Sequence, residues 1–574
     1  MAERKNRVLL LLLLLATPCT AAIYGRPHII LILADDLGWN DVSFHGSDQI
    51  PTPNIDALAY NGVILNSHYV QPTCTPTRAA FMTGRYPVHL GMQGNSLVAA
   101  ESRGLPPGKI LPQYLKDLGY TTRAVGKWHL GFYKPEVTPT YRGFDSHLGY
   151  WNDYVSYYDY ILQERYSDGE YNGFDLRRNL SAAWELAGRY ATDVFTDEAV
   201  RIIQGHDASP LGPPLFLYLA HLAVHAGNRG KLLEAPQQEI DKFRHIRDPN
   251  RRTYAAMVSK LDESVGRVVQ ALQRRHMLES SVILFLSDNG APSKGRQPNW
   301  GSNWPLKGVK ETLWEGGVRG VGLIWSPLLQ QTPRVSSQLM HVTDWLPTLY
   351  TAAGGHVASL RHDLDGVDQW ESLVYNLASP RREILHNIDE RGRTAAVRFH
   401  NWKLIIGTVR SSALNGYFGH GELDASYPAY NETSVVNSMA GRAIIAASSS
   451  VYINPTRAHQ ISLLRSSAQI TCPSNNSLGI PPCSGKELCL YDIESDPCES
   501  SNLAETHRSV ALRLRALLSA HRNALVKQSN LQPDVRGANP KRWNGTWSPW
   551  LLDGCGSRAS EDAYFNVCDR TEPL

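Results

Sequence analysis

Three short segments are apolar at almost every position: 28–34 (HIILILA), 215–219 (LFLYL) and 281–286 (SVILFL). A strand with one face in water alternates apolar and polar side chains, so runs without alternation predict strands that are covered on both faces. Between them lies a segment with helical spacing of apolar residues, 252–277. Strands that alternate with helices predict an α/β fold with a mostly parallel central sheet flanked by helices.

Acidic pairs follow two of these apolar runs. Asp35 and Asp36 come directly after the first run, and Asp288 and Asn289 come just after the third. The carboxyl ends of parallel strands share one edge of a sheet, so these side chains are expected to converge. Each pair alone would also suit a helix cap or a turn. Together they are hard oxygen ligands, which favour Ca²⁺ or Mg²⁺.

Basic and histidine side chains are predicted near the same edge. A metal ion with several fixed cations stabilises the charge on a tetrahedral oxyanion ester, either sulfate or phosphate. Histidine suits proton transfer near neutral pH. Taken singly, each lysine or arginine is more often a solvated surface residue, and each histidine more often a structural hydrogen-bonding group, than part of a catalytic site. The candidates are Arg78, Arg85, Lys127, His129, His225 and Lys310.

The first 22 residues have the features of a cleaved secretory signal peptide. They combine a basic start, the apolar run 8–16 and small residues before Ala22. The apolar run is too short for a stable membrane anchor. Without this leader the net charge falls from +3 to near +1, which gives no signature of nucleic-acid binding. A lysosomal or secreted glycoprotein is expected, with sequons at Asn179, Asn431, Asn475 and Asn544.

Cysteine usage separates one cysteine from the rest. Six cysteines fall late in the chain and predict three disulfides, for which about 15 pairings are possible. They are Cys472, Cys483, Cys489, Cys498, Cys555 and Cys568. Cys74 is left over, and an odd cysteine in a secreted protein calls for a separate explanation.

The pattern changes near residue 390. Segments 394–406 and 488–493 have the partial alternation of antiparallel strands, and 507–526 is an amphipathic helix. We therefore expect a catalytic domain at 23–390 and a smaller α+β domain with an antiparallel sheet and disulfides at 391–574.

The motifs resemble those of the type I, formylglycine-dependent sulfatases. Cys74-Thr75-Pro76-Thr77-Arg78 matches their C-x-P-x-R signature and is followed by Thr83-Gly84-Arg85. The flanking motifs ADDLGWNDVSFHG, GKWHLG, GFDSHLGY, LSDNGA and LWEGGVRG agree. Within the family, NWPLKGVKETLWEGGVRG is similar to the arylsulfatase B, I and J group. The resemblance covers roughly residues 26–350.

The resemblance implies an alkaline-phosphatase-like catalytic domain and a set of roles. Cys74 would be oxidised to Cα-formylglycine by the formylglycine-generating enzyme, which explains the unpaired cysteine. Arg78 would hold the aldehyde hydrate, and His129 would orient it and help its later collapse. Asp35, Asp36, Asp288 and Asn289 would bind one Ca²⁺ together with residue 74. Lys127, His225 and Lys310 would contact the sulfate.

The implied reaction is hydrolysis of a sulfate monoester through a covalent intermediate. One hydroxyl of the hydrate attacks sulfur, and the alcohol or phenol leaves with a proton from His225 or Lys310. The second hydroxyl then loses its proton, and the aldehyde re-forms as sulfate departs. The substrate is expected to be a sulfated glycan or small molecule. An N-acetylgalactosamine 4-sulfate end is one candidate and a small sulfated metabolite its rival. The stretch 151–171, rich in Tyr and Asp, is expected to shape the pocket.

Two other functions are considered. A phosphatase or phosphodiesterase of the same superfamily would have a Ser or Thr nucleophile and additional His ligands, whereas the signature position here is Cys74. A secreted, non-catalytic sulfatase-like protein would have lost site residues, and each residue of the expected set is present. One departure is that 90–200 contains no cysteine, unlike arylsulfatase B. The sequence does not predict an oligomeric state.

Overall fold

The computed structural model describes residues 25–209, 211–407, 412–419, 427, 429–448, 456, 458–472, 483 and 488–551. The expected signal peptide, Asn475, Cys555 and Cys568 lie outside these residues. Within the described part of the chain, no helix has the length and apolar character needed to cross a membrane.

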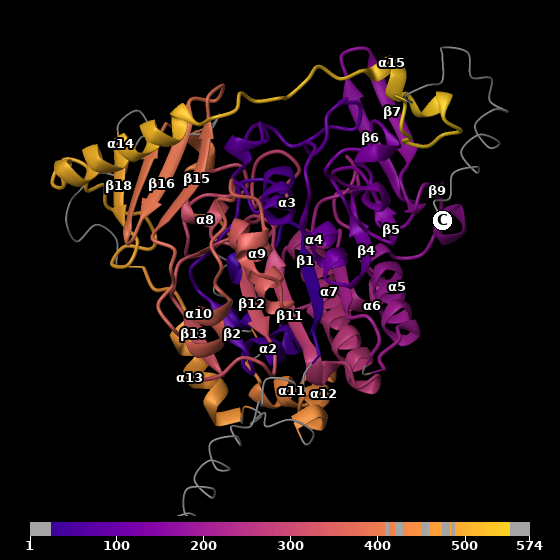
Figure 1. The fold of residues 1–574 in the computed structure, drawn as a ribbon, viewed down its shortest axis with the longest axis horizontal. Coiled ribbons are helices and arrows are strands. Elements are labelled where there is room, and N and C mark those ends of the chain that lie inside the picture. Colours follow the sequence, from indigo (N-terminus) through magenta and orange to yellow (C-terminus); the bar gives the residue numbers. More distant parts are fainter. Residues whose placement is uncertain are drawn as a thin grey trace, which may run out of the picture.

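A ten-stranded sheet forms the centre of the molecule (Figure 1). Strand β1 pairs in parallel with β10 on one side and with β11 on the other, and the parallel order continues through β4 to β5. At the flanks, β12 runs antiparallel to its neighbours β11 and β2, and β8 runs antiparallel to its neighbours β5 and β9. The predicted mostly parallel sheet is therefore confirmed. Its order is β13 (Arg334–Ser336), β2 (Val63–Leu65), β12 (Gly322–Trp325), β11 (Ser281–Ser287), β1 (His28–Ala34), β10 (Leu215–Ala220), β4 (Thr121–Lys127), β5 (Ser146–Tyr150), β8 (Arg177–Arg178) and β9 (Ser181–Ala182).

The three apolar runs form the central strands because they are buried along their whole length. Two groups of helices flank the sheet. The first contains α2 (Pro53–Ala59), α5 (Ala191–Gly205) and α7 (Pro249–Arg274), and the second contains α3 (Cys74–Thr83), α4 (Leu111–Asp117) and α9 (Trp345–Ala352).

Helix α7 begins three residues before the predicted segment 252–277. It starts at Pro249 because the Asp248 side chain accepts a hydrogen bond from the Arg251 N–H, and proline is favoured in the first turn. Helix α3 starts at Cys74 itself. Pro76 lies in the first turn, where a missing N–H costs nothing, so it does not delay the helix.

A second, four-stranded antiparallel sheet follows in the chain and carries α14 (Arg508–Asn523) on its outer side (Figure 1). The predicted stretch 394–406 is a hairpin of two strands, because His400 takes a left-handed conformation between them. The strands are β15 (Glu383–Asp389), β16 (Thr394–Phe399), β17 (Trp402–Ile406) and β18 (Leu488–Asp492). Strand β15 precedes residue 390, and the domain limits stay a prediction.

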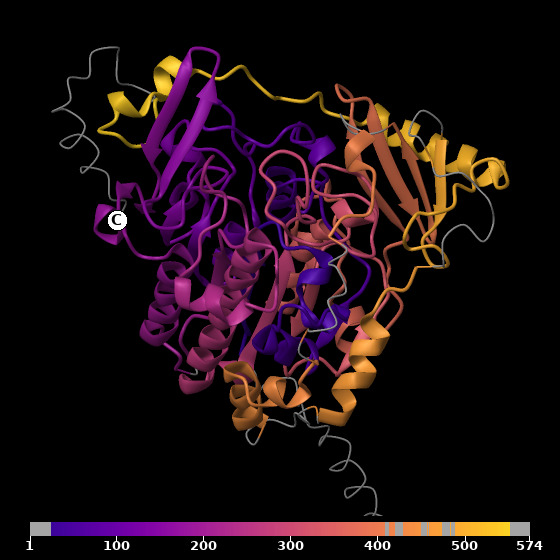
Figure 2. The same cartoon turned by 180° about the vertical axis from the view of Figure 1, so that it is seen from behind.

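Three further helices return to the central sheet. Helix α12 (Met439–Ser448) packs on α2 and α7, and α11 (Glu432–Val436) packs on α2, while α13 (Ala458–Ala468) contacts α11 and β13. In both views they lie at the end of the molecule away from α14 (Figure 1, Figure 2).

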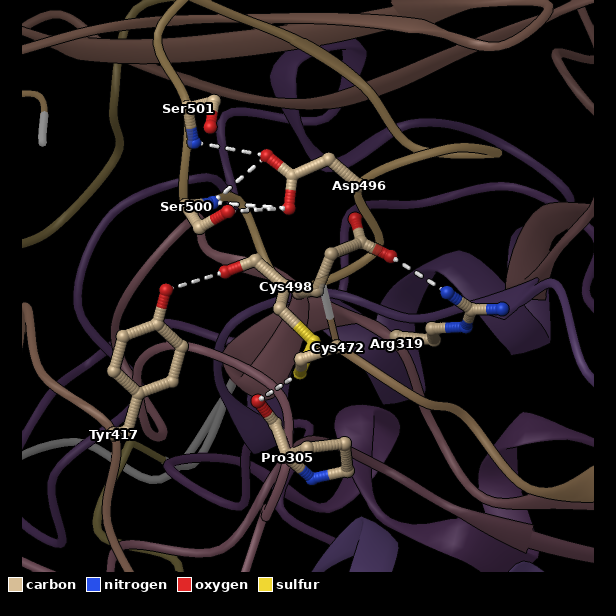
Figure 3. The surroundings of a disulfide bond; sticks show 9 residues. Pro305, Arg319, Tyr417, Cys472, Asp496, Cys498, Ser500 and Ser501 are labelled. Carbon is tan, nitrogen blue, oxygen red and sulfur yellow. Dashed lines mark hydrogen bonds and ion pairs between the residues drawn. A yellow bond between two sulfur atoms is a disulfide. The ribbon is translucent and has the colours of Figure 1, made fainter. Parts of the chain in front are cut away.

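Two disulfides join cysteines of the late set. Cys472 pairs with Cys498, and Cys483 pairs with Cys489. Figure 3 shows the first of these beside Pro305 and Arg319 of the catalytic region. It fastens the chain after α13 to the loop after β18, next to the central fold. Two of the predicted disulfides are thus present, with their pairing resolved.

Three of the four sequons lie on the surface of the described structure. Asn179 and Asn544 are exposed turn residues with positive φ, and Asn431 caps α11 with its side chain while remaining exposed. Each is accessible for glycosylation, which stays a prediction.

Candidate active site

The two acidic strand ends meet as predicted. Strands β1 and β11 are adjacent and in register, with Ala34 opposite Ser287, so the residues that follow them face each other. The Asp36 N–H donates to Asp288 Oδ1 at 3.2 Å, and Asn289 Nδ2 donates to Asp36 Oδ1 at 2.6 Å. Asp35, Asp36, Asp288 and Asn289 are all fully buried.

Cys74 lies against this acidic group. As the first residue of α3, it points its Sγ at Asp35 Oδ1, 3.4 Å away, and at Asp36 Oδ1, 4.0 Å away. It is the only free cysteine among the described residues, and it is buried.

Arg78 lies one helical turn beyond Cys74 and is also fully buried. Its guanidinium donates to Asp288 Oδ2 at 2.9 Å, to the Lys127 carbonyl at 3.3 Å and to the Tyr218 hydroxyl at 3.4 Å. Arg78 therefore links α3 to the ends of β11, β4 and β10.

Two lysines complete the positive charge of the site. Lys127 Nζ, at the end of β4, lies 2.7 Å from Asp35 Oδ2, and Lys310 Nζ lies 2.7 Å from Asp36 Oδ1. Burial alone would lower the pKa of both amines, but the neighbouring carboxylates, Asp35 and Asp36 first, raise both pKa values above their usual range. Both lysines are therefore charged at physiological pH.

The hydrogen-bond partners of His129 fix which of its nitrogens can exchange a proton. Nε2 lies 3.0 Å from the Leu97 carbonyl, which only accepts, so Nε2 carries a hydrogen. Nδ1 is left facing the site, 3.3 Å from Asp153. Burial lowers the pKa of His129 to about 3, although Asp153 opposes this. The ring is therefore neutral, and Nδ1 is the nitrogen that can accept a proton.

His225 is oriented in the opposite way. Its Nδ1 lies 2.6 Å from the Ala226 carbonyl, and its Nε2 faces the site, 3.4 Å from Asp36 Oδ2. Tyr154 stacks on the ring with centroids 5.7 Å apart. This packing holds Nε2 toward the acidic group.

Asp153 belongs to the site although no single-residue signal in the sequence identified it. Its carboxylate lies 3.1 Å from Lys127 Nζ and 3.8 Å from His225 Nε2, besides its contact with His129. Burial would raise the pKa of Asp153, but the positive charges of Lys127 and Lys310 help to hold it well below the usual value. Asp153 follows β5 within the stretch 151–171, which was expected to shape the pocket.

Most of the cluster is closed to solvent. The side chains of Lys127, His129 and His225 are at most 1% exposed, whereas Asp153 is 23% and Lys310 is 12% exposed. The site therefore reaches water on the side of Asp153 and Lys310. Arg85, another candidate cation, lies outside the cluster and pairs with Asp363 at the surface.

The donor set fits a divalent cation that prefers oxygen ligands. Asn289 Oδ1 is buried without a hydrogen-bond partner, which leaves a carbonyl oxygen available as a ligand. Ligand-capable atoms of Asp35, Asp36, Cys74 and His225 all lie within 4.8 Å of one another. Four carboxylates, including Asp153, face only three permanent cations, so the cluster has room for added positive charge.

A family model matches the part of the chain that forms the central sheet and the site. The family model described as Sulfatase matches residues 27–355, more than half of the chain. The chain belongs to the sulfatase family. The prediction of a sulfatase, made from the segment around Cys74, is thereby confirmed, and this sulfatase hydrolyses sulfate esters.

Individual relatives agree with this placement. The sulfatase is 37% identical to arylsulfatase J of Mus musculus, over 92% of this chain and 81% of that protein. It is 33% identical to N-acetylgalactosamine-6-sulfatase of Canis lupus familiaris, over 64% of this chain and 69% of the relative. It is 32% identical to human arylsulfatase A, over 65% of this chain and 72% of the relative.

Solved structures share the fold. Ps i-CgsB in complex with k-i-k-neocarrahexaose superposes with a TM-score of 0.65 at 26% identity and covers 90% of this sulfatase and 97% of its own chain. The PsFucS1 sulfatase from Pseudoalteromonas sp. gives a TM-score of 0.61 at 23% identity, over 88% and 92% of the two chains, which is a likeness of fold alone.

Proposed function

We propose that this sulfatase uses residue 74, oxidised from cysteine to Cα-formylglycine, as its nucleophile beside a bound Ca²⁺. The position of Cys74 carries the proposal. It is the one unpaired cysteine of the described residues, and its side chain is buried where the acidic strand ends and the fixed cations converge. The formylglycine-generating enzyme is the partner that would make the modification.

Asp35, Asp36, Asp288 and Asn289 would hold the Ca²⁺ together with residue 74. When bound, the ion supplies positive charge that stabilises negative charge developing on the sulfate oxygens. The buried Asn289 Oδ1 that lacks a partner supports this assignment, as do the three fully buried carboxylates.

The chain's own cations have separate tasks. Arg78 contacts Asp288 and lies on the same helix face as residue 74, so it positions both. Lys127 pairs with Asp35 and Lys310 pairs with Asp36, and both ammonium groups are placed to bind the sulfate oxygens. Fixed charges in a site closed to water stabilise a transition state without reorganisation.

The two histidines divide the proton transfers. Nδ1 of neutral His129 can take a proton from a hydroxyl on residue 74. Nε2 of His225 faces the site, and Lys310 lies on its solvent side, so either can deliver a proton to the leaving oxygen. The neighbouring acids raise the pKa of Lys310, which makes it harder for this amine to donate its proton.

The substrate we propose is the sulfated end of a glycan, such as an N-acetylgalactosamine 4-sulfate group. Among the site side chains only Asp153 and Lys310 are appreciably exposed, which favours entry of a terminal group. One relative is named N-acetylgalactosamine-6-sulfatase, so the 4-sulfate and the 6-sulfate should both be compared as substrates. We also propose a secretory route, lysosomal or extracellular, because the leader, sequons and disulfides agree with it.

Replacing Cys74 tests the nucleophile. Mass spectrometry of the peptide around residue 74 should show an aldehyde in place of the thiol when the protein is made with the formylglycine-generating enzyme. Cys74→Ala should lower aryl sulfate hydrolysis by about a thousandfold or more, as loss of a nucleophile does in other hydrolases. An unmodified thiol in fully active enzyme would overturn the proposal.

A pair of lysine variants separates a role in the site from general damage. Lys127→Met should abolish most activity, whereas Lys307→Met removes another buried lysine, which lies 3.8 Å from the Trp314 ring centroid and outside the cluster. Lys307→Met should keep the turnover of the parent enzyme. Equal losses in both variants would mean that buried charge in general, and not this site, is being measured.

Calcium is tested by binding as well as by activity. Calorimetric titration of the metal-stripped enzyme should show one Ca²⁺ site, and Asp36→Asn should weaken it by at least about tenfold. Comparing the rates of hydrolysis of 4-sulfated N-acetylgalactosamine, 6-sulfated N-acetylgalactosamine and an aryl sulfate would then identify the preferred ester. Hydrolysis of aryl sulfate alone would refute the glycan-end substrate and leave the nucleophile untouched.

A further inference from the structure

Helix α14 presents two very different faces. Ala511, Leu514 and Leu518 are buried and pack against the second sheet. An exposed flank lies beside this buried stripe, and we call it the α14 arginine face: Arg508, Leu512, Arg515, Ser519 and Arg522. Figure 1 and Figure 2 both show α14 at the edge of the molecule, with the sheet on its inner side.

The arginines on this face are regularly spaced. Arg508, Arg515 and Arg522 follow one another at seven-residue intervals, which keeps them on one side of a helix. At about 1.5 Å per residue, successive guanidinium groups start about 10 Å apart. The result is a straight row of three positive charges along a rigid element.

The row has no compensating acid. The segment from residue 506 to 533 contains four arginines and one lysine but neither Asp nor Glu, although the whole chain has 57 basic and 54 acidic residues. Among the described residues, none of Arg508, Arg515 and Arg522 forms an ion pair. This segment therefore carries more positive charge than the net charge of the entire chain.

The first arginine of the row is unfavourable for the helix itself, whereas Arg522 lies in the last turn, where a cation is favoured. Arg508 is the first helical residue, where the helix dipole disfavours a cation, and the first turn contains no acid. His507 at the N-cap makes no side-chain capping bond. A sequence that departs from local helix preferences without a structural gain points to a functional demand at that place.

We propose that the α14 arginine face is a binding site for a linear sulfated polysaccharide, separate from the active site. The choice of ligand rests on the proposed function, in which the enzyme acts on sulfated glycan ends. Guanidinium groups pair with sulfate oxygens through parallel hydrogen bonds, and a row of them matches a chain that carries repeated negative charge. The face would hold an internal part of such a polymer near the enzyme and raise the local concentration of its ends.

A lipid surface fits this face less well. A helix that binds a bilayer buries an apolar face in it. The apolar face of α14 is already packed against the sheet, and Leu512 is the only large apolar side chain in the exposed row. The face carries positive charge but has no apolar surface that could enter a bilayer, so it favours a soluble polyanion over a membrane.

The chain after α14 leads from the arginine face toward the active site. Val526 and Ser529 donate backbone hydrogen bonds to the carbonyls of Val88 and Gly91. That partner segment continues to Leu97, whose carbonyl accepts from His129. Lys527 is exposed on this path, so positive charge continues beyond the helix.

Binding should be measured with the full-length Cys74→Ala protein, which does not turn the polymer over. The test variant carries Arg508→Ser, Arg515→Ser and Arg522→Ser. The control carries Arg244→Ser, Arg274→Ser and Arg442→Ser, which remove the same charge from exposed positions on other helices or loops. Loss of Arg508 removes an unfavourable helix-dipole contact, so the test variant should fold normally.

The probes are immobilised chondroitin sulfate, the same polymer after chemical desulfation, and anionic phosphatidylserine vesicles. We expect the test variant to lose at least about tenfold in affinity for the sulfated polymer and to show a weaker dependence on salt, while the control stays within about twofold. Equal affinity of the test and control variants would overturn the proposal. So would vesicle binding that depends on the three arginines while polymer binding does not.

Activity distinguishes this proposal from the one on which it rests. In enzyme that retains Cys74, the test variant should hydrolyse a small aryl sulfate at the parent rate but have a lower kcat/KM on the sulfated polymer. If the parent fails on glycan ends, the proposed substrate is wrong, whereas the binding comparison in Cys74→Ala protein still decides whether the arginine face is a polyanion site.

Discussion

Lys403 in the second sheet contacts two buried acids, Glu315 at the start of α8 (Glu315–Val318) and Glu499 in the loop after β18. From β17 its Nζ lies 2.8 Å from Glu315 Oε1 and 2.8 Å from Glu499 Oε1, and all three side chains are 0% exposed. Arg319 also contacts Glu315, at 3.3 Å. We predict that Lys403→Met destabilises the protein strongly, because Glu315 keeps Arg319 whereas Glu499 is left without an ion-pair partner among the described residues, where water does not reach.

The magnitude follows from burial and pH. Breaking a fully buried ion pair by removing one partner costs about 3–5 kcal/mol. Burial raises the pKa of Glu499 to about 7, against the pull of Lys403. Without Lys403 this pKa rises further, so above pH 7 the variant must bind a proton that the parent protein has released, and the cost of the substitution grows by up to about 1.4 kcal/mol per pH unit. At pH 5 Glu499 binds a proton, and the cost should fall to about 1–3 kcal/mol, that of an unsatisfied polar group.

A second lysine provides the control. Lys260 also contacts two acids, Asp193 and Glu263, at 2.8 Å and 2.6 Å, but those acids are 35% and 38% exposed. Lys260→Met should cost only about 0–1 kcal/mol. Urea unfolding of both variants at pH 5 and pH 8, followed by tryptophan fluorescence, gives the comparison. Equal destabilisation in the two variants, or no pH dependence for Lys403→Met, would refute the reasoning.

Three further predictions concern pH, anion affinity and glycans. Burial raises the pKa of Asp262 to about 7, so the folded state binds this proton more tightly than the unfolded chain does. Stability should therefore decline as pH rises from about 4 to 7. Unfolding midpoints of Asp262→Asn should decline less over that range, and an unchanged slope would contradict the assignment. Asp153→Asn removes a carboxylate 3.1 Å from Lys127 Nζ, so inhibition by inorganic sulfate should tighten by at least about fivefold, whereas weaker inhibition would show that Asp153 is needed to position the cation. Gln substitution at Asn179, Asn431 or Asn544 should each remove one glycosidase-sensitive mass step on electrophoresis, and a variant without such a change marks an unused sequon.

The central sheet and its acidic edge could be predicted because their sequence signals are local and redundant. The segment 28–34 is apolar throughout, which leaves a fully covered strand as the simplest outcome, and Asp35 and Asp36 then mark its end. The same holds for β11 with Asp288. Because β1 and β11 pair in parallel and in register, the residues that follow the two strands lie close together.

Asp153 shows where that reasoning stops. It follows β5, whose sequence SHLGY is short and of mixed polarity, so the strand has no clear signal. Its place in the site is set by pairing with β4, which puts Lys127 opposite Tyr150. A residue three positions beyond an unrecognised strand end cannot be assigned to the edge of a sheet from sequence alone.

Helices α11, α12 and α13 were missed for a different reason. They are short, with 5, 10 and 11 residues, and helices of this length are marginal without tertiary packing. In α12, Ala440, Ala443 and Ile444 are buried against α2 and α7. Tertiary packing, which the sequence does not display, therefore decides their structure.

The charge balance of the active site connects its separate parts. Asp35, Asp36, Asp288 and Asp153 outnumber the permanent cations Arg78, Lys127 and Lys310 by one, in surroundings that are nearly closed to water. A sulfate ester brings a further negative charge, which such a cluster would repel. One divalent cation reverses the sign of the site. Metal loading and substrate affinity should therefore be coupled. Asp153 lies at the solvent side and is not one of the proposed metal ligands, so it is the acid whose removal should relax that coupling.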